Sequence, residues 1–155
     1  MLSNPDAKKY FELHFGSQIS DSSWYRLKRV LRDCQMEITL ENLETVANLK
    51  LAKQYTQLSL KQLINCYVQA QRLVKEQVII KGDTVFKELQ KRTKNKPHRT
   101  TIIRWFQNSV KPINGKFFDK NRSYQAEELV KVFASALMYE AKQSLKLGKK
   151  HEKPH

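Results

Sequence analysis

The stretch from residue 84 to 137 constrains the fold most, because helix and turn signals follow one another along it in a fixed order. Apolar residues from Val85 onward recur at helical spacing, and Pro97 discourages this helix from continuing. A second helix is predicted after Pro97, capped by Thr100 and Thr101, with Arg104 on its outer face. The two patterns predict a pair of helices joined by a short turn.

A hairpin signal follows this pair of helices. Asn114-Gly115 lies between two short apolar runs, and both residue types tolerate the positive φ that a tight hairpin turn needs. A third amphipathic run begins near Glu127. Helix, turn, helix, hairpin, helix is the order of a winged helix-turn-helix. We therefore expect a mostly α fold with long amphipathic helices, in which the hairpin forms a small β wing.

Positive charge is concentrated in the same stretch. Residues 85–125 carry eleven Lys or Arg and two acidic residues, which supplies +9 of the formal net charge of +14. Contact with phosphates supplies much of the affinity of a DNA-binding protein, so this charge favours a nucleic-acid partner over a merely solvated basic surface. Duplex DNA is the first candidate. RNA ranks last, because no stretch resembles an RNP sheet motif or a GXXG loop.

Two further motifs resemble the DNA-binding domain of MerR-type regulators. Residues 86–93 (FKELQKRT) match the first helix of that family, and residues 103–107 (IRWFQ) match its second. Its wing ends in arginine-x-tyrosine, as do residues 122–124 here. The chain departs from the family in its longer turn and in the position of the domain, which is not at the N-terminus. The resemblance implies a MerR-like winged helix-turn-helix that binds DNA.

The compact layout, without a large ligand domain, resembles a narrower group, the Cas V-K repressors of CRISPR-associated transposons. That resemblance implies a homodimer on a palindromic operator, and repression rather than activation. It leaves open the operator sequence and any effector ligand.

The first third of the chain predicts three more helices. One covers residues 5–15, a capping cluster at residues 20–23 starts the second, and Thr39 caps the third. Residues 22–26 align with 100–104, and 39–43 align with 125–129, which suggests a diverged internal duplication. The alignment is short and gapped, so coincidence stays open. The first copy lacks an Asn-Gly hairpin.

We therefore expect four segments. Residues 1–57 form a helix-turn-helix-like unit, 58–82 a connecting or dimerisation helix with a linker, 83–148 the winged unit, and 149–155 a flexible tail. The apolar stripe from Leu58 to Val74 is either core or a dimer seam. The last helix is expected from Gln125 to Leu147, ended by Gly148.

Candidate site residues fall into two groups. Predicted DNA contacts in the winged unit are Arg99, Thr100, Thr101, Arg104, Lys111, Lys116, Arg122 and Tyr124. Predicted DNA contacts in the first unit are Ser22, Ser23, Tyr25, Arg26 and Arg29. Predicted dimerisation residues are Leu60, Leu63, Ile64, Tyr67, Leu129 and Phe133. The sequence leaves open which unit reads bases, although charge favours the second.

Enzymatic chemistry is not expected. There is no phosphate-binding glycine loop, nucleophile elbow or zinc-type cysteine pairing, and the carboxylates are scattered, so no catalytic site, cofactor or metal is predicted. Cys34 and Cys66 are expected to be buried, reduced thiols. The N-terminus has no signal-peptide pattern and no run suits a membrane span, so a cytoplasmic, nucleoid-associated protein is expected.

These inferences predict a sequence-specific DNA-binding transcriptional regulator, acting as a homodimeric repressor. The alternative is an excisionase-like or architectural DNA-binding protein of a mobile element, which would share the wing and the helix pair. A genome-wide footprint separates them, because a repressor occupies promoter palindromes and an accessory factor occupies clustered sites at a transposon end.

Overall fold

The computed structural model describes residues 3–53, 56–75, 80–94 and 97–152. In these ranges the expectation of a mostly α protein is confirmed, since the regular structure consists of seven helices and two strands of two residues each. Contacts between residues divide the chain into a first unit, residues 1–68, and a second unit, residues 69–155. The division falls inside the predicted segment 58–82.

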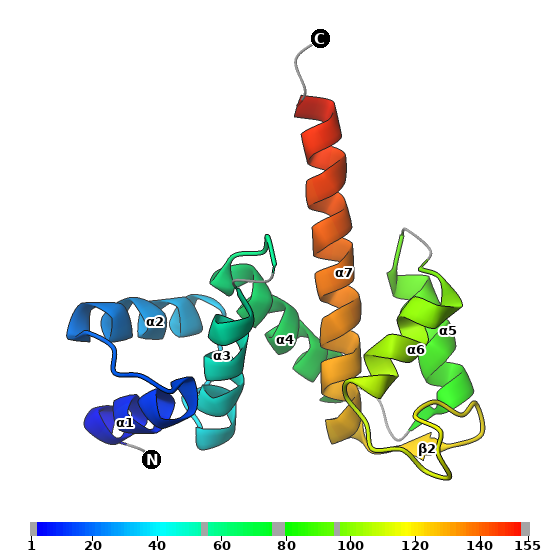
Figure 1. Cartoon of the computed structure of the whole chain (residues 1–155), viewed down its shortest axis with the longest axis horizontal. Coiled ribbons are helices and arrows are strands. Elements are labelled where there is room, and N and C mark those ends of the chain that lie inside the picture. Colours follow the sequence, from blue (N-terminus) through cyan, green and yellow to red (C-terminus); the bar gives the residue numbers. More distant parts are fainter. Residues whose placement is uncertain (1–2, 54–55, 76–79, 95–96, 153–155) are drawn as a thin grey trace. The chain divides into compact units, whose positions relative to one another are not determined.

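Helices build the first unit (Figure 1). They are α1 (Asn4–Phe15), α2 (Asp21–Asp33), α3 (Leu40–Ala52) and the first part of α4 (Leu60–Lys75). The first three each begin with a hydroxyl side chain that accepts a backbone N–H three residues on, at Ser3, Ser20 and Thr39. Such a bond satisfies one of the free N–H groups of a helix start. The helix starts predicted around Ser20 and Thr39 are confirmed.

The core of the first unit gathers one face of each helix. Helix α1 packs against α3. The largest fully buried side chains of this core are Phe11, Leu31, Leu43, Ile64 and Val46. The predicted apolar face of α2 is confirmed at Trp24, Leu27 and Leu31, whereas Val30 is only partly buried.

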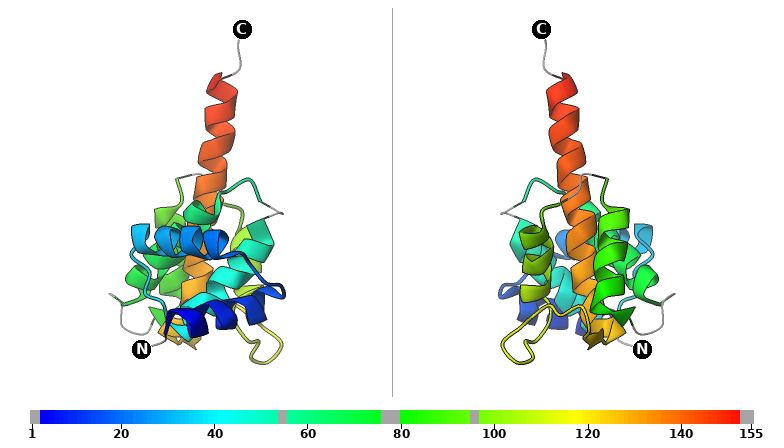
Figure 2. Two further views of the ribbon diagram at one scale, coloured as in Figure 1. Left: turned by 90° about the vertical axis from the view of Figure 1, so that its left-hand side faces the viewer. Right: turned by 90° about the vertical axis from the view of Figure 1, so that its right-hand side faces the viewer.

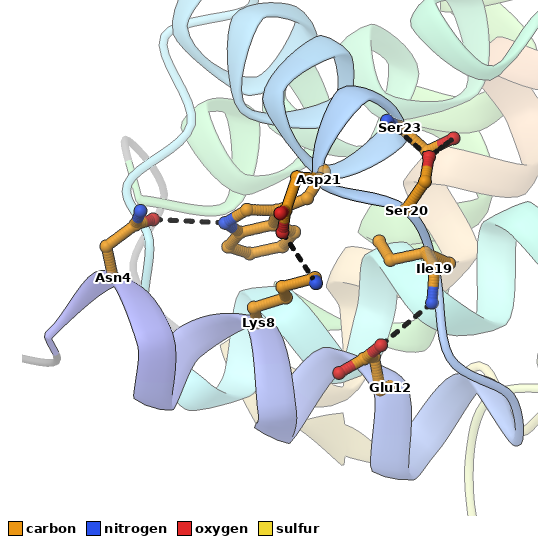
Figure 3. A network of polar contacts seen from close by, with 8 residues as sticks. Asn4, Lys8, Glu12, Ile19, Ser20, Asp21 and Ser23 are labelled. Atoms are coloured by element: carbon orange, nitrogen blue, oxygen red, sulfur yellow. Dashed lines mark hydrogen bonds and ion pairs between the residues drawn. The ribbon is translucent and has the colours of Figure 1, made fainter.

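Polar bonds tie α1 to the start of α2 (Figure 3). Trp24 Nε1 donates a hydrogen bond of 3.0 Å to Asn4 Oδ1, and Lys8 Nζ lies 2.9 Å from Asp21 Oδ1. Ile19 donates its backbone N–H to Glu12 Oε2 at 2.8 Å. Three residues of α1 at spacing i, i+4 and i+8 therefore fix the loop and the first turn of α2.

The second unit contains the end of α4, then β1 (Ile80–Lys81), α5 (Gly82–Arg92), α6 (Arg99–Gln107), β2 (Ser123–Tyr124) and α7 (Ala126–Glu152). Strands β1 and β2 pair antiparallel, with Ile80 opposite Tyr124 and Lys81 opposite Ser123. Gly82 donates its N–H to the Arg122 carbonyl at 2.8 Å. A Cβ at Gly82 would collide with the Asp119 carbonyl, so only glycine fits this close approach of two backbones.

Side chains of α5, α6, β2 and α7 meet in the core of this unit. Its fully buried members include Val85, Leu89, Ile102, Phe106, Tyr124, Leu129, Val132 and Phe133. The Phe106 ring lies 5.0 Å from that of Phe118 and 5.3 Å from that of Tyr124, measured between centroids. These aromatic contacts join α6 to the segment that follows the hairpin.

Helix α7 packs its first turns against α5 and α6 and then continues beyond them (Figures 1 and 2). The prediction that Gly148 ends this helix is wrong, because the helix reaches Glu152. A glycine inside a helix costs only about 1 kcal/mol relative to alanine, so glycine alone does not force an end. Part of the predicted tail, residues 149–152, is therefore helical, and residues 153–155 lie outside the described ranges.

Candidate nucleic-acid interface

Helix α6 presents a polar face opposite a buried one. Ile102 and Phe106 are fully buried, whereas Arg99, Thr100 and Arg104 are exposed. Thr101 is half-buried. The predicted outward direction of Arg104 is thus confirmed. Trp105 is also buried, which the helical spacing alone did not predict, and its ring centroid lies 5.6 Å from that of Tyr139 on α7.

The start of α6 differs from the prediction. His98, not a threonine, occupies the N-cap position, and no side chain caps the helix there. Thr100 and Thr101 lie in the first turn, where the Thr100 hydroxyl is 3.1 Å from His98 Nδ1. The capping prediction is wrong because the helix already begins at Arg99, so both threonines lie inside its first turn. Both threonine side chains therefore remain on the surface of the first turn instead of capping it.

Arg99 is oriented by two aromatic rings. Its guanidinium carbon lies 5.4 Å from the ring centroid of Phe86 and 5.9 Å from that of Phe118. A cation over an aromatic face is stabilised by the charge distribution of the ring. Beside this cluster lies a cavity of about 290 Å³, lined by Asp83, Phe86, Arg99, Lys116, Phe118, Asp119 and Lys120. The sequence pattern did not predict that Arg99 lies against Phe86 and Phe118. The aromatic pair Phe117-Phe118 after the hairpin was the sequence feature that could have indicated it.

The predicted Asn-Gly turn is present. Asn114 and Gly115 have φ of 52° and 74°, and Ile113 exchanges two backbone hydrogen bonds of 2.9 and 3.0 Å with Lys116. These features match the two-residue hairpin loop with positive φ at both positions. Lys111 and Lys116 are exposed on this hairpin, as predicted for phosphate contacts. Ile113 at its tip is 55% exposed.

Arg122 and Tyr124 hold the hairpin from inside. Arg122 Nη1 donates to the Lys111 carbonyl at 2.9 Å, and its Nη2 lies 3.8 Å from Glu128 Oε1. The Tyr124 hydroxyl donates to the Phe117 carbonyl at 2.9 Å. The Arg122 side chain is 11% exposed and Tyr124 is fully buried. Their prediction as direct DNA contacts is therefore wrong, because Tyr124 is fully buried and the mostly enclosed Arg122 directs its guanidinium at the Lys111 carbonyl and the Glu128 carboxylate.

The environment of Tyr124 affects its ionisation. Burial raises the pKa of the Tyr124 phenol, and the hydrogen bond from the Asp119 N–H opposes this rise. The Arg122 guanidinium carbon lies 4.6 Å from the Tyr124 ring centroid. At neutral pH the Tyr124 phenol therefore keeps its proton, and its hydroxyl links the Asp119 N–H to the Phe117 carbonyl.

Two cations of α5 are paired with acidic residues on the same helix. Lys87 Nζ lies 3.2 Å from Asp83 Oδ2, and Arg92 Nε lies 3.4 Å from Glu88 Oε2, both at spacing i, i+4. Exposed pairs of this kind contribute little stability, and they reduce the charge available to a duplex. The positive potential of this unit therefore rests more on α6 and the hairpin than on α5.

The predicted contacts of the first unit lie on α2. Ser22, Arg26 and Arg29 are exposed, and Tyr25 is 64% exposed. Ser23 is half-buried; its N–H donates to the Ser20 hydroxyl oxygen, and its own hydroxyl accepts from that hydroxyl. Four of the five predicted residues are thus accessible on one helix.

The predicted dimerisation residues belong to the cores instead. Leu63, Ile64, Leu129 and Phe133 are all at most 3% exposed within a single chain. Leu60 and Tyr67 are partly buried and pack against the core of the first unit. The dimer-seam prediction is wrong for the four buried residues, because side chains already buried within one chain present no surface to a second copy.

Comparisons with known proteins add no relative. No protein-family model matches the chain, and neither a curated protein nor a solved structure does.

Across the described ranges, no three His, Cys, Asp or Glu side chains are grouped as a metal ion would need. None of the helices in those ranges has the length and apolar character needed to cross a membrane. Cys34 and Cys66 are buried free thiols, as predicted, and burial raises the pKa of each.

Proposed function

We propose that the second unit is a MerR-like winged helix-turn-helix and that the protein is a sequence-specific DNA-binding regulator of transcription. In this proposal α5 and α6 are the helix pair, α6 enters the major groove, and the hairpin is the wing. The observation that carries it is the α6 surface. Arg104 is exposed opposite the buried Ile102 and Phe106, on the helix whose first residue, Arg99, contacts the segment following the hairpin.

The roles of the side chains follow from their positions. Arg104 and Thr101 reach base edges or phosphates from α6, and Lys111 and Lys116 hold the backbone from the wing. Arg99, fixed on its two aromatic rings, gives a phosphate contact with little loss of side-chain freedom. The homodimeric repressor on a palindromic operator is part of the proposal, since specific helix-turn-helix proteins usually pair two half-sites. The second candidate function is an architectural protein that holds two DNA segments. It is favoured by Arg26, an exposed cation on α2 of the first unit, which could contact a second duplex.

The experiment begins by selecting bound sequences from a random duplex library and mapping chromosomal sites by genome-wide footprinting. Promoter palindromes support the regulator, and clustered sites at the end of a mobile element support the architectural protein. Affinity for the selected duplex should fall steeply with salt, because several cations meet phosphates. An affinity that stays flat between low and physiological salt contradicts duplex binding through this surface.

Two matched substitutions then identify the reading unit. Arg104→Ala should weaken binding to the selected duplex by about 1–3 kcal/mol and relax its sequence preference, because a bidentate base contact is lost. Arg26→Ala removes the same group from an exposed position on α2, and should cost less and affect all sequences evenly. If Arg26→Ala abolishes specific binding while Arg104→Ala leaves it intact, the first unit is the reader.

A further inference from the structure

The first unit has a groove beside α2 whose chemistry differs from that of the proposed DNA surface. Its cavity volume is about 490 Å³. Apolar side chains that line it are Tyr25, Leu31, Met36 and Ile38, and the cations that line it are Lys28, Arg29 and Arg32. Glu37 is the acidic member of this lining. The groove therefore combines an apolar floor with a positive rim.

The end of α2 builds this groove. Gln35 adopts a left-handed φ of 59°, and Met36 donates its backbone N–H back to the Leu31 carbonyl at 2.9 Å. This reversal is the common way for a helix to end, and it brings the residue after the turn against the last helical turns. Met36 is buried with Leu31, and the chain then passes along α2 to Ile38.

Exposed apolar side chains are concentrated in this unit. Tyr25 and Ile38 line the groove and are 64% and 41% exposed. Leu40, two residues past Ile38, is 45% exposed. In the described part of the second unit, Ile113 is the exposed large hydrophobic residue. Burying such side chains against an apolar partner is favourable because it removes apolar surface from water.

A nucleic-acid phosphate backbone has no apolar groups to bury against the apolar lining of this groove. The cavity next to Arg99 shows the contrast, because charged side chains make up most of its lining. Protein segments that bind in grooves combine apolar anchors with charged residues around them. A partner for the α2 groove should thus carry both an apolar stripe and carboxylates.

We propose that the α2 groove binds an acidic amphipathic helix of a partner protein. One or two apolar side chains of that helix enter between Tyr25, Met36 and Ile38, and its carboxylates face Lys28, Arg29 and Arg32. Glu37 repels carboxylates at its own position, but three cations outnumber it in the lining, so an acidic segment is favoured over a basic one. This assigns Tyr25 and Arg29 to a protein partner instead of the predicted DNA contact, and it is independent of the DNA-binding proposal for the second unit.

The test uses the full chain and a fluorescein-labelled synthetic peptide of about 16 residues, roughly four helical turns. The peptide carries Leu or Phe at spacing i, i+3, i+4, i+7 and Glu at most other positions. Fluorescence polarisation should show a Kd on the order of 1–100 µM. A peptide with serine in place of the apolar residues, and one with lysine in place of glutamate, should each bind at least about tenfold more weakly.

Matched variants locate the site. Ile38→Ser and Arg29→Glu should each weaken peptide binding at least about tenfold, since one removes an apolar contact and the other reverses a rim charge. Leu13→Ser and Lys9→Glu make the same chemical changes at exposed positions of α1 outside the groove, and should leave binding unchanged. Far-UV circular dichroism verifies that all four variants remain folded. Arg104→Ala should not affect the peptide, so this test and the DNA test fail separately.

Three results overturn the proposal. The first is a Kd for the acidic peptide weaker than about 1 mM. The second is equal loss of binding in the α1 control variants. The third is displacement of the peptide by duplex DNA together with a larger loss of duplex binding in Arg29→Glu than in Arg104→Ala, which would make α2 a nucleic-acid surface.

Discussion

At the scale of single residues, Arg122 and Tyr124 show how polar side chains can organise a surface without being on it. Their hydrogen bonds reach the carbonyls of Lys111 and Phe117, one on each side of the hairpin turn. Arg122 also faces Glu128 in the first turns of α7. The position of the exposed hairpin lysines therefore depends on one fully buried side chain and one that is mostly enclosed.

The pH dependence of stability should report on Tyr124. Burial raises its pKa above the ordinary value of about 10, so the folded protein keeps the phenolic proton after the unfolded chain has lost it. The free energy of unfolding should then fall as pH rises above about 10, while below that pH this contribution is constant. Urea unfolding, followed by Trp105 fluorescence in a Trp24→Phe background, measures this slope.

The control for this prediction is Tyr124→Phe, which cannot titrate. It should be less stable by about 1 kcal/mol at neutral pH because a buried hydrogen bond is lost, and should show a shallower decline at alkaline pH. Lysine deprotonation affects both proteins equally. Parallel pH curves for the two proteins would show that Tyr124 makes no contribution.

At the scale of elements, the helix ends differ in how they are fixed. Helices α1, α2 and α3 start with side-chain caps, whereas α5 and α6 start without them. The start of α5 is fixed instead by backbone bonds from Gly82 and Asp83 to the segment 120–122. The first three helices of the first unit therefore start at local side-chain caps, whereas the start of α5 in the second unit relies on tertiary contact.

Loss of one cap should show this dependence directly. Ser20→Ala removes the oxygen that accepts the Ser23 N–H, and should lower the free energy of unfolding of the first unit by about 1 kcal/mol. Ser22→Ala is the matched control, since Ser22 is exposed and lies within the first turn of α2. Trp24 fluorescence in a Trp105→Phe background follows the transition. Equal effects of the two substitutions would contradict the capping role.

The features predicted correctly from sequence are those that local physics determines. The turn at Asn114-Gly115 and the cap at Thr39 need only their own backbone conformations. The inward direction of Arg122 was not predictable, because the carbonyls that accept from it belong to Lys111 and Phe117, on the two sides of the hairpin turn, and come together only when the hairpin forms. The burial of Leu129 and Phe133 could be predicted as an apolar face, but the pattern does not say which surface covers it.

At the scale of the whole molecule, the burial of the predicted seam shifts the proposed homodimer to another part of α7. Leu137, Ala141 and Leu145 recur at spacing i, i+4, i+8 on this helix, and all three are only half-buried. A second copy could cover such a stripe through helix pairing. Under the two proposals, the second unit would bind DNA and the first unit would bind a protein partner.

Light scattering should show a dimer at a concentration on the order of tens of micromolar. Leu145→Glu should shift it to a monomer, because a charge at a paired helix face loses its hydration, whereas Lys142→Glu at an exposed position should not. A monomeric wild-type protein at this concentration, with and without duplex DNA, rules out the homodimer.

The hairpin turn has a chemical consequence in time. Asn114 is exposed, and among the described residues none beyond the two chain neighbours of Gly115 lies within 4 Å of the position where Gly115 would carry a Cβ. No bulky side chain therefore shields the Gly115 nitrogen, which attacks the Asn114 side-chain amide when asparagine deamidates. Asparagine is among the thermally labile residues, and its deamidation leaves a carboxylate. Stored protein should accumulate a more acidic form, separable by cation exchange, that binds duplex DNA more weakly because a negative charge now stands on the hairpin beside its lysines. The Asn-Gly pair that shapes the hairpin turn would therefore slowly lower the positive charge of the hairpin during storage.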